Sequence, residues 1–324
     1  MDTFISIIQG AITIAVVYLY GCVGETLNEK VGHLNLGIPG IMSIGALGGI
    51  VGVNVYYEMV PDYSSTIGLL TMSILFTLIF AGLAGLIYAF FTVTLKSNQN
   101  VTGLVLTTFG LGIMKGLGKL FYDSSVEGIT RYRNASIAMK KLFVGAENLG
   151  WFGQIFLSYG FLVYLAFILA IAAHFILKYT RVGLYARSIG ESPQTADAQG
   201  INVELYKYIY IIIGAAIAGL GGLYYAMDKT SGTSFLELDI AAFGWVAVAL
   251  VIFSIWKPLF GILGSLLFGF LFIIGSYIPT NSTALFGIVP YAVTILILII
   301  TSILNKKGSQ APASLGVNYD REER

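Results

Sequence analysis

The sequence predicts an all-α membrane protein that crosses the bilayer several times. Of its 324 residues, 56% are hydrophobic and 11% are charged, and the mean hydropathy is +0.83. A soluble domain carries about 25% charged residues, so this composition excludes an ordinary water-soluble fold. The apolar residues also gather into long runs, many of which reach the roughly 20 residues that a membrane-spanning helix needs.

We count about nine apolar segments of spanning length, with about eight to ten as the bounds, because the glycine-rich ones can be broken or re-entrant. They lie near residues 4–22, 34–55, 67–91, 101–122, 158–179, 206–226, 241–256, 259–278 and 285–304. The first lacks the basic region and cleavage site of a signal peptide, so it is interpreted as a span. Residues 1–305 are therefore predicted to form one transmembrane domain, and the polar residues 306–324 a disordered tail.

Basic residues in the short loops predict the orientation. If residues 178–205 are cytoplasmic, then Lys30, Lys96, Lys207 and Lys257 fall on the same side, as the positive-inside rule requires. The C-terminal tail is then cytoplasmic too. The outer loop 123–157 carries four basic residues, which weakens the charge bias without reversing it. Its Trp151-Phe152 pair is a candidate anchor for a partner or for the membrane surface.

One sequence motif occurs twice. Residues 81–89, AGLAGLIYA, are similar to residues 218–226, AGLGGLYYA. Each copy is followed by an equally spaced polar residue and glycine, namely Asn98 with Gly103 and Asp239 with Gly244. The predicted topology sends the two copies through the membrane in opposite directions, so they would form an inverted repeat with a transport path at its interface. Chance recurrence of common membrane residues is the alternative.

Small residues four apart indicate close helix packing. They let two backbones approach, as in small-xxx-small motifs. The pairs are Gly45 with Gly49, Gly48 with Gly52, Gly112 with Gly116, and Gly214 with Ala218 and Gly222.

Several function classes are excluded by what the sequence lacks. A net charge of +1 does not suit a nucleic-acid partner, and the single cysteine, Cys22, cannot form an internal disulfide. Gly118-Lys119 is followed by Leu120, so no phosphate-binding loop is present. No hydrolase or metal-ligand motif appears either. We therefore expect no catalytic residue, metal site or cofactor, and the chain is not expected to be an enzyme.

The predicted spans also contain almost no ionisable residues, which an ion-coupled carrier usually needs deep in the membrane. His174, near the cytoplasmic end of its span, is interpreted as structural. Lys115 and Lys119 lie one turn apart near an outer end, where they either reach the outer surface or line an outward vestibule. Without an internal energy source, uphill transport would have to be driven by a partner.

Polar side chains that could line a path are few. The candidates are Asn35, Ser43, Thr107 and Thr108. Uncharged hydroxyls and amides suit a neutral polar solute that passes without binding tightly. Hydrogen bonding between helices is the alternative for the same residues.

The polar stretch 178–201 is predicted to present a short helix. Ser192 is a good N-cap, Pro193 suits the first helical position, and Gly200 can adopt the left-handed conformation that ends a helix. A helix of about two turns is too short to be stable alone, so it makes sense as an element presented to a partner. An ordinary loop with a helical turn is the alternative.

This stretch resembles the cytoplasmic coupling loop of permeases from bacterial ABC importers. The pattern is R-x-G-L-x-x-R-x-x-G-E-x-P-x-x-A-x-x-x-G-I, from the family that includes ribose, branched-chain amino acid and nucleoside permeases. The matching residues are Arg181, Gly183, Leu184, Arg187, Gly190, Glu191, Pro193, Ala196, Gly200 and Ile201. The resemblance implies that the short helix, with its cap Ser192, docks in a groove of a separate ATPase subunit. Ala196 and Ala198 would permit the close contact.

Residues 24–40 are similar to the G-E-x-x-x-E-[RK]-x-G-x-x-N-L-G-x-x-G segment of nucleoside-type permeases. Glu25, Glu29, Lys30, Gly32, Asn35, Leu36, Gly37 and Gly40 match. Pro39 stands where that group commonly carries a glutamate, which puts a role for that acid in doubt. Shorter matches near Asn98-Gln99, Trp256 and Pro290 extend the resemblance over most of the chain.

The resemblance implies a type II ABC importer-like fold in a bacterial cell membrane. The implied partners are ATPase subunits, a second and non-identical permease, and an extracytoplasmic substrate-binding lipoprotein. The implied cargo is a nucleoside. The same machinery carrying a simple sugar or an amino acid is one alternative, and a passive channel or secondary carrier without an ATPase is another.

Overall fold

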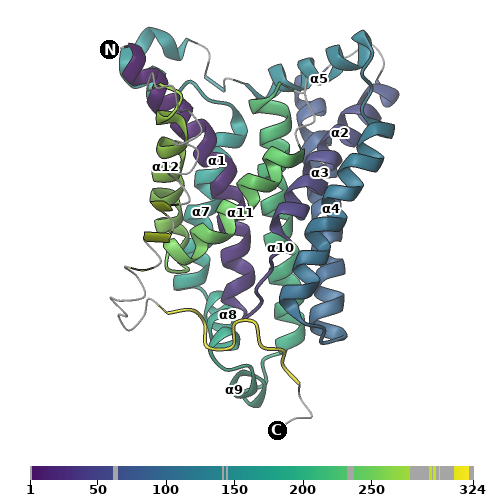
Figure 1. Cartoon of the computed structure of the whole chain (residues 1–324), viewed down its shortest axis with the longest axis vertical. Helices are drawn as coiled ribbons and strands as arrows, with labels where there is room; N and C mark the ends of the chain where they lie inside the picture. Colours follow the sequence, from purple (N-terminus) through teal and green to yellow (C-terminus); the bar gives the residue numbers. More distant parts are fainter. Residues whose placement is uncertain are drawn as a thin grey trace.

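In a computed structural model, the chain forms a bundle of long helices (Figure 1). The structure describes residues 2–60, 65–140, 142–143, 145–231, 237–277 and 310–320, with isolated positions between 292 and 299. No strand occurs in these ranges. The six longest apolar helices are α1 (Asp2–Lys30), α2 (Ile38–Met59), α3 (Thr66–Ala89), α4 (Gln99–Phe121), α7 (Phe161–Tyr179) and α10 (Val203–Leu223).

Shorter helices complete the described part. They are α5 (Val126–Met139), α6 (Gly150–Phe156), α8 (Arg181–Glu191), α9 (Pro193–Ala198), α11 (Glu237–Phe253) and α12 (Pro258–Ile274). Six helices of the described chain are long and apolar enough to cross a membrane, while α11 and α12 are shorter apolar helices. The predicted span 285–304 lies largely outside the described residues. The all-helical class is therefore confirmed, and the total of about nine spans stays a prediction.

Polar residues at helix starts define where the helices begin. In each case the side chain accepts a hydrogen bond from a backbone N–H of the first turn, which has no partner within the helix. These caps are Ser65 for α3, Asn98 for α4, Ser125 for α5, Thr180 for α8 and Asn202 for α10. Local sequence thus determines these boundaries.

Helix α1 continues eight residues beyond the predicted end of its span. The sequence predicted a segment ending at residue 22, whereas the helix reaches Lys30 and buries Glu25 and Glu29 completely. The expectation of spans with almost no ionisable groups is therefore wrong for α1. The reason is tertiary, because both carboxyl groups find hydrogen-bond donors in other segments.

The two copies of the repeated motif pack against each other. Gly85 of α3 faces Ala215 of α10, and Ala81 faces Gly219, so the two helices run antiparallel. Each helix also passes into a π-helical segment, η1 (Phe90–Thr94) after α3 and η3 (Tyr224–Lys229) after α10. The copies therefore have the inverted orientation that the predicted topology required.

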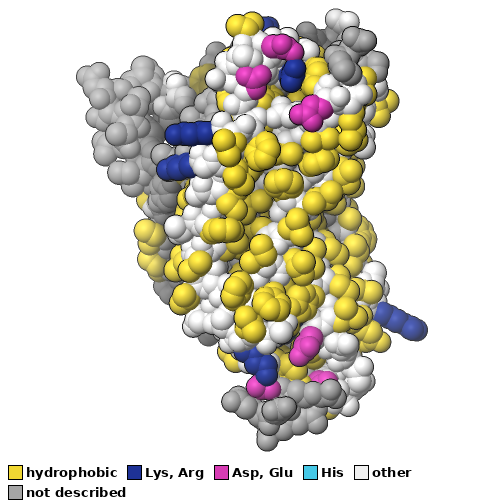
Figure 2. All heavy atoms as spheres, turned by 90° about the vertical axis from the view of Figure 1, so that its right-hand side faces the viewer, with side chains coloured by type: hydrophobic (Ala, Val, Ile, Leu, Met, Phe, Trp, Pro, Cys, Tyr) yellow, Lys and Arg dark blue, Asp and Glu magenta, His cyan; other side chains and the backbone are white. Residues whose placement is uncertain are grey.

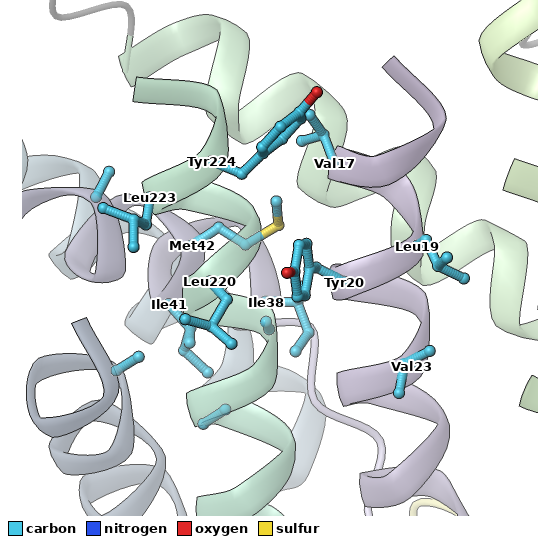
Figure 3. Packing of buried hydrophobic residues seen from close by; sticks show 14 of the residues in the cluster. Val17, Leu19, Tyr20, Val23, Ile38, Ile41, Met42, Leu220, Leu223 and Tyr224 are labelled. Atoms are coloured by element: carbon cyan, nitrogen blue, oxygen red, sulfur yellow. The ribbon is translucent and has the colours of Figure 1, made fainter. Parts of the chain in front are cut away.

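The core lies where α1, α2 and α10 meet (Figure 3). Val17 and Tyr20 of α1, Met42 of α2 and Leu220 of α10 are buried there. The Tyr20 hydroxyl donates to the backbone oxygen of Leu162 at 2.6 Å, so this polar group is satisfied inside the apolar core. Helix α2 is the most enclosed of the six long helices. In α2, 89% of the most apolar stretch is buried, whereas the buried share is 33% in α4 and in α7. The last two helices therefore present one side to the surroundings.

Glycine pairs permit the closest crossings of two helices at some of the predicted positions but not at all of them. At the α2–α10 crossing, a Cβ added to Gly45 would stand 2.5 Å from Cα of Gly219, so no side chain fits. On α4, by contrast, nothing lies within 4 Å of a Cβ added to Gly112 or Gly116. The prediction that this second pair packs against another helix is thus wrong within the described chain, and the pair lies on an open face.

Residues 310–320 follow a defined path across the end of the bundle that carries α8 and α9 (Figure 1). Ser314 N–H donates to the backbone oxygen of Gly190 at 2.9 Å, and Gly316 N–H donates to that of Gly32 at 3.1 Å. Disorder was predicted for the whole tail from residue 306, and it does not hold for this part, which we call the C-terminal strap. The strap is held because it supplies donors to carbonyl groups that helix ends leave open.

Candidate functional site

The short helix predicted in the polar stretch is present as α9. Ser192 is its N-cap, with the hydroxyl oxygen accepting from Thr195 N–H at 3.3 Å, and Pro193 takes the first helical position. Gly200 has φ +82°, the left-handed conformation expected after the helix end. All three local predictions are confirmed, since they depend on residues within one or two turns of one another.

The exposed face of α9 differs from the expected one. Pro193 and Ala196 are buried against the chain itself, so Ala196 is not available to a partner as the sequence suggested. Gln194, Ala198 and Gln199 are exposed instead. The hydrogen bonds do not decide this orientation, which follows from packing the apolar side of the short helix onto the bundle.

Helix α8 forms a platform for α9. Its start lies against the end of α7, because a side chain at Gly183 would collide with the backbone oxygen of Ile176. Its end lies against α1, because a side chain at Gly190 would collide with the backbone oxygen of Lys30. Arg181, Arg187 and Glu191 of α8 are exposed. The α8 residues on which the resemblance rests are thus of two kinds. The buried glycines let α8 pack closely against α7 and α1, and the charged residues are exposed around it.

The C-terminal strap fastens this platform to two other segments. The Ser314 hydroxyl donates to the backbone oxygen of Gly190 at 2.7 Å. Asn318 accepts from the Gln99 amide at 3.1 Å and donates to the backbone oxygens of Lys96 and Ser97. Asp320 forms an ion pair with Lys96 at 2.6 Å. The strap therefore connects α8 with the α3–α4 loop, a connection that no local sequence signal indicated.

The break between α1 and α2, residues 31–37, is buried and hydrogen-bonded. Its backbone groups are satisfied by side chains from elsewhere: Leu34 N–H donates to the Gln99 side chain at 2.9 Å, and Tyr88 donates to the Leu34 oxygen at 2.8 Å. Thr107 donates to the Leu36 oxygen at 2.7 Å. Non-helical backbone that joins two membrane helices is tolerated when its polar groups are satisfied within the protein in this way.

Three of the four predicted path residues belong to this packed region. The Asn35 side-chain oxygen accepts from Gly37 N–H at 2.9 Å, and its side-chain nitrogen is buried without a described partner. The Ser43 hydroxyl donates to the Pro39 oxygen at 2.9 Å. Only Thr107 of α4 bonds across to another segment, whereas Asn35 and Ser43 bond to backbone groups two and four residues away. Hydrogen bonding between segments, the alternative that the sequence left open, therefore describes Thr107.

The sequence analysis missed the two acids that hold this break. Glu25 accepts from Asn35 N–H at 2.7 Å and from the Asn28 amide at 2.8 Å. Glu29 accepts from the Trp256 indole N–H. Their spacing of four residues places both on one face of α1. That spacing is a signal that the sequence contained, but the donors come from residues far along the chain.

His33 lies in the same break with both ring nitrogens buried and without a described hydrogen-bond partner. Its ring meets that of Tyr88 edge to face, with centroids 6.5 Å apart. Burial, reinforced by the nearby Lys207 ammonium, holds the pKa of His33 well below 6.5. The imidazole is therefore neutral at physiological pH.

The fourth predicted path residue, Thr108, lies on an open face of α4. Its hydroxyl donates to the Leu104 oxygen of its own helix at 3.1 Å and is exposed. Lys115 and Lys119 are exposed farther along the same helix. Figure 2, which looks at this side of the molecule, shows hydrophobic side chains over the middle and charged side chains gathered toward the two ends. This distribution matches a surface that lies at membrane depth.

The end of the bundle opposite α9 carries a second polar region. Asp123 accepts from Ser125 N–H at 2.8 Å, and this backbone hydrogen bond together with one from the Ser125 side chain lowers the pKa of Asp123. Trp151 and Phe152 are both exposed here, so the proposed aromatic anchor is accessible. Among the described residues, no group of three or more His, Cys, Asp or Glu side chains could hold a metal ion.

Comparison with known proteins gives consistent matches. The family described as the permease component of branched-chain amino acid transport systems matches residues 7–298. The nucleoside ABC transporter permease NupC of Lactococcus lactis subsp. cremoris is 32% identical over 315 residues, covering 93% of this chain and 92% of that protein. The guanosine ABC transporter permease NupQ of Bacillus subtilis is 30% identical, covering 98% and 97%. A protein of Haloferax volcanii that is provisionally named a glucose ABC transporter permease, TsgC13, is 29% identical, covering 82% and 75%.

Proposed function

We propose that this chain, which belongs to the family of permease components of branched-chain amino acid transport systems, is the membrane subunit of an ATP-driven importer for nucleosides. In this proposal, an ATPase subunit binds α8 and α9 on the cytoplasmic side, and an extracytoplasmic binding protein delivers the solute to the other side. The transmembrane character and the role as an ABC transporter permease follow from the family and the apolar helices.

The proposal rests on how α9 is attached to the rest of the chain. A helix of six residues has no stability of its own, yet it is capped, packed on α8 and connected through α8 to α1, α7 and the C-terminal strap. Through these contacts, a partner that displaces α9 would also displace the helices of the bundle. Its exposed residues Gln194, Ala198 and Gln199 would form the contact.

The nucleoside cargo rests on the relatives. Two of them, at 32% and 30% identity over nearly the whole chain, are a nucleoside and a guanosine permease. A simple sugar is the second candidate, since the Haloferax relative at 29% identity carries a glucose permease name.

The open face of α4 is the surface we assign to a second permease subunit and to the path between the two. It carries Thr108 at its middle and Lys115 and Lys119 toward the outer end. Gly112 and Gly116 on this face have no side chains, which leaves room for a helix of the partner to approach. A neutral solute would pass exposed hydroxyl groups there without meeting a buried charge.

Binding of the ATPase tests the proposal first. We expect Ala198→Arg, on the exposed face of α9, to abolish co-purification of the ATPase subunit without lowering the yield of the permease. Val126→Arg is the matched control, because Val126 is 85% exposed at the other end of the bundle. Recovery of the permease in its active form with no ATPase bound would instead support a channel or carrier.

Uptake then tests the cargo. Proteoliposomes with the complete transporter and binding protein should accumulate labelled purine nucleoside when ATP is present, and accumulate ribose and leucine much less. An ATPase that cannot hydrolyse ATP should abolish accumulation. Preferential uptake of ribose or leucine would overturn the nucleoside assignment while leaving the ATP-driven mechanism in place.

A further inference from the structure

A cavity of about 830 Å³ lies at the α8 end of the bundle, apart from the surfaces discussed so far. It is bounded by the ends of α1 and α7, by α8, and by the start of α12. The proposed path makes no use of it, and of the two helices assigned to the ATPase only α8 reaches it, through Arg187.

The polar part of the cavity is strongly positive. Lys30, Lys178, Arg187 and Lys257 reach it from four different segments, and no carboxylate is among its described lining residues. In the described part of the chain, none of the four forms an ion pair within 4 Å. Two acids act electrostatically on Lys30, namely Glu191 and Glu29, and Glu29 already accepts a hydrogen bond from Trp256. Cations that line one cavity repel one another unless an anion lies between them, and both Arg187 and Lys257 act on Lys30 in this way.

The start of α12 adds a further anion-binding element. Its N-cap, Lys257, makes no side-chain capping hydrogen bond, and Pro258 occupies the first position. The positive end of the helix dipole therefore points at the cavity without a capping acceptor. The helix is 17 residues long, so this end has a full dipole contribution.

The remaining wall is apolar and partly exposed at the surface of the chain. Leu259 and Leu263 lie one turn apart on α12, and Leu263 is 62% exposed. Leu177 of α7 also lines the cavity, and farther along α7 Phe175 and Ile168 are exposed. A groove with a cationic end and an apolar wall matches the two halves of a phospholipid, a phosphodiester headgroup and an acyl chain.

We propose that this cavity binds an anionic phospholipid. The phosphodiester lies between Lys30, Arg187 and Lys257 at the start of α12, and an acyl chain extends along Leu259 and Leu263 between α7 and α12. The same lipid would connect α8 to α1 and α12, because Arg187 belongs to α8. The site is independent of the cargo and of the identity of the ATPase.

The test uses the full chain purified with its partner subunits in neutral-lipid nanodiscs. Binding of dioleoylphosphatidylglycerol and of dioleoylphosphatidylcholine is measured by native mass spectrometry or by a labelled-lipid titration. We expect the anionic lipid to bind at least about tenfold more tightly than the neutral one, because each basic residue near a phosphate contributes to the difference. Equal binding of the two lipids would overturn the proposal.

Charge variants locate the binding. Lys178→Gln combined with Lys257→Gln should weaken binding of the anionic lipid by about tenfold or more. Both side chains are exposed, so folding should be preserved. Arg133→Gln combined with Lys229→Gln removes the same charge at the other end of the bundle and should leave binding unchanged. Equal loss in both double variants would mean unspecific attraction to the whole protein and would overturn the site.

A second variant separates a lipid from a soluble phosphate. Leu263→Gln should weaken phosphatidylglycerol binding several-fold and leave competition by glycerol 3-phosphate unchanged, because only the acyl chain contacts Leu263. If glycerol 3-phosphate displaces the lipid at equal concentration, or if Leu263→Gln has no effect, the occupant is a free phosphate compound and the lipid assignment is wrong.

Discussion

Two regions of the bundle carry polar residues within apolar helices, and they differ in what those residues contact. Around the break at residues 31–37, polar side chains from α1, α3 and α4 bond to backbone groups inside the protein. On the open face of α4, Thr108 and Lys119 are exposed. The first region stabilises a bend in the chain, whereas the second is available to a solute or a subunit.

Thr107 and Thr108 show the difference between neighbouring residues. Successive residues of a helix point about 100° apart, so Thr107 reaches the Leu36 oxygen while Thr108 faces outward. A hydroxyl in a membrane helix therefore indicates a path only when the structure leaves it without a partner on another segment. The predictions below test this distinction between a packed and an open side.

The largest effect is expected from a pair of glycines on α4. A Cβ added to Gly110 would stand 2.5 Å from the backbone oxygen of Gly40, whereas nothing lies within 4 Å of one added to Gly112. We expect Gly110→Val to destabilise the chain by about 3 kcal/mol, because overpacking against backbone cannot relax. Gly112→Val should leave the melting temperature of the purified chain nearly unchanged. Equal destabilisation by the two variants would show that the open face is packed in the protein.

A smaller effect is expected at Glu25. Glu25→Leu leaves the Asn35 N–H and the Asn28 amide without their acceptor, which should lower the free energy of unfolding by about 2 kcal/mol. Glu25→Gln keeps one carbonyl oxygen and should cost about half as much. Thermal melting in detergent measures both, with the exposed Glu127→Gln as control. A wild-type melting temperature for Glu25→Leu would show that Glu25 does not stabilise the break between α1 and α2.

His33 makes the packed region sensitive to acid. Because the folded chain holds its pKa well below 6.5, the unfolded chain takes up a proton there first as the pH falls. The stability of the neutral form is complete above pH 6.5 and declines below it, by up to about 1.4 kcal/mol per pH unit. His33→Phe should melt with a shallower pH dependence between pH 6.5 and 5. The prediction fails if the two melting curves shift in parallel.

The smallest effects are expected at the C-terminal strap. Ser314→Ala removes the hydroxyl donor to Gly190 and should cost about 1 kcal/mol, seen as faster hydrogen exchange in residues 186–192. Asp320→Asn removes a partly exposed ion pair with Lys96 and should cost less than about 1 kcal/mol. Unchanged exchange in Ser314→Ala would mean that the strap lies on α8 without holding it.

The sequence by itself determined the features that depend on near neighbours. Composition and run length gave the all-helical membrane class, and the first eight predicted segments each correspond to a helix. Ser192, Pro193 and Gly200 correctly placed α9, since capping and termination act within about one turn. The resemblance to permeases, based on residues 181–201 and 24–40, agrees with the family match over residues 7–298.

Tertiary structure decided which side chains are enclosed and by what. Glu25 and Glu29 extend α1 because Asn35 and Trp256 supply donors. Ala196 faces inward, although it was expected to contact the ATPase, and Gly112 faces outward, although it was expected to pack against a helix. The strap is ordered through Gly190 and Gly32, more than a hundred residues earlier. The local sequence shows that a group can form a hydrogen bond, but the packing of distant segments determines which partner it finds.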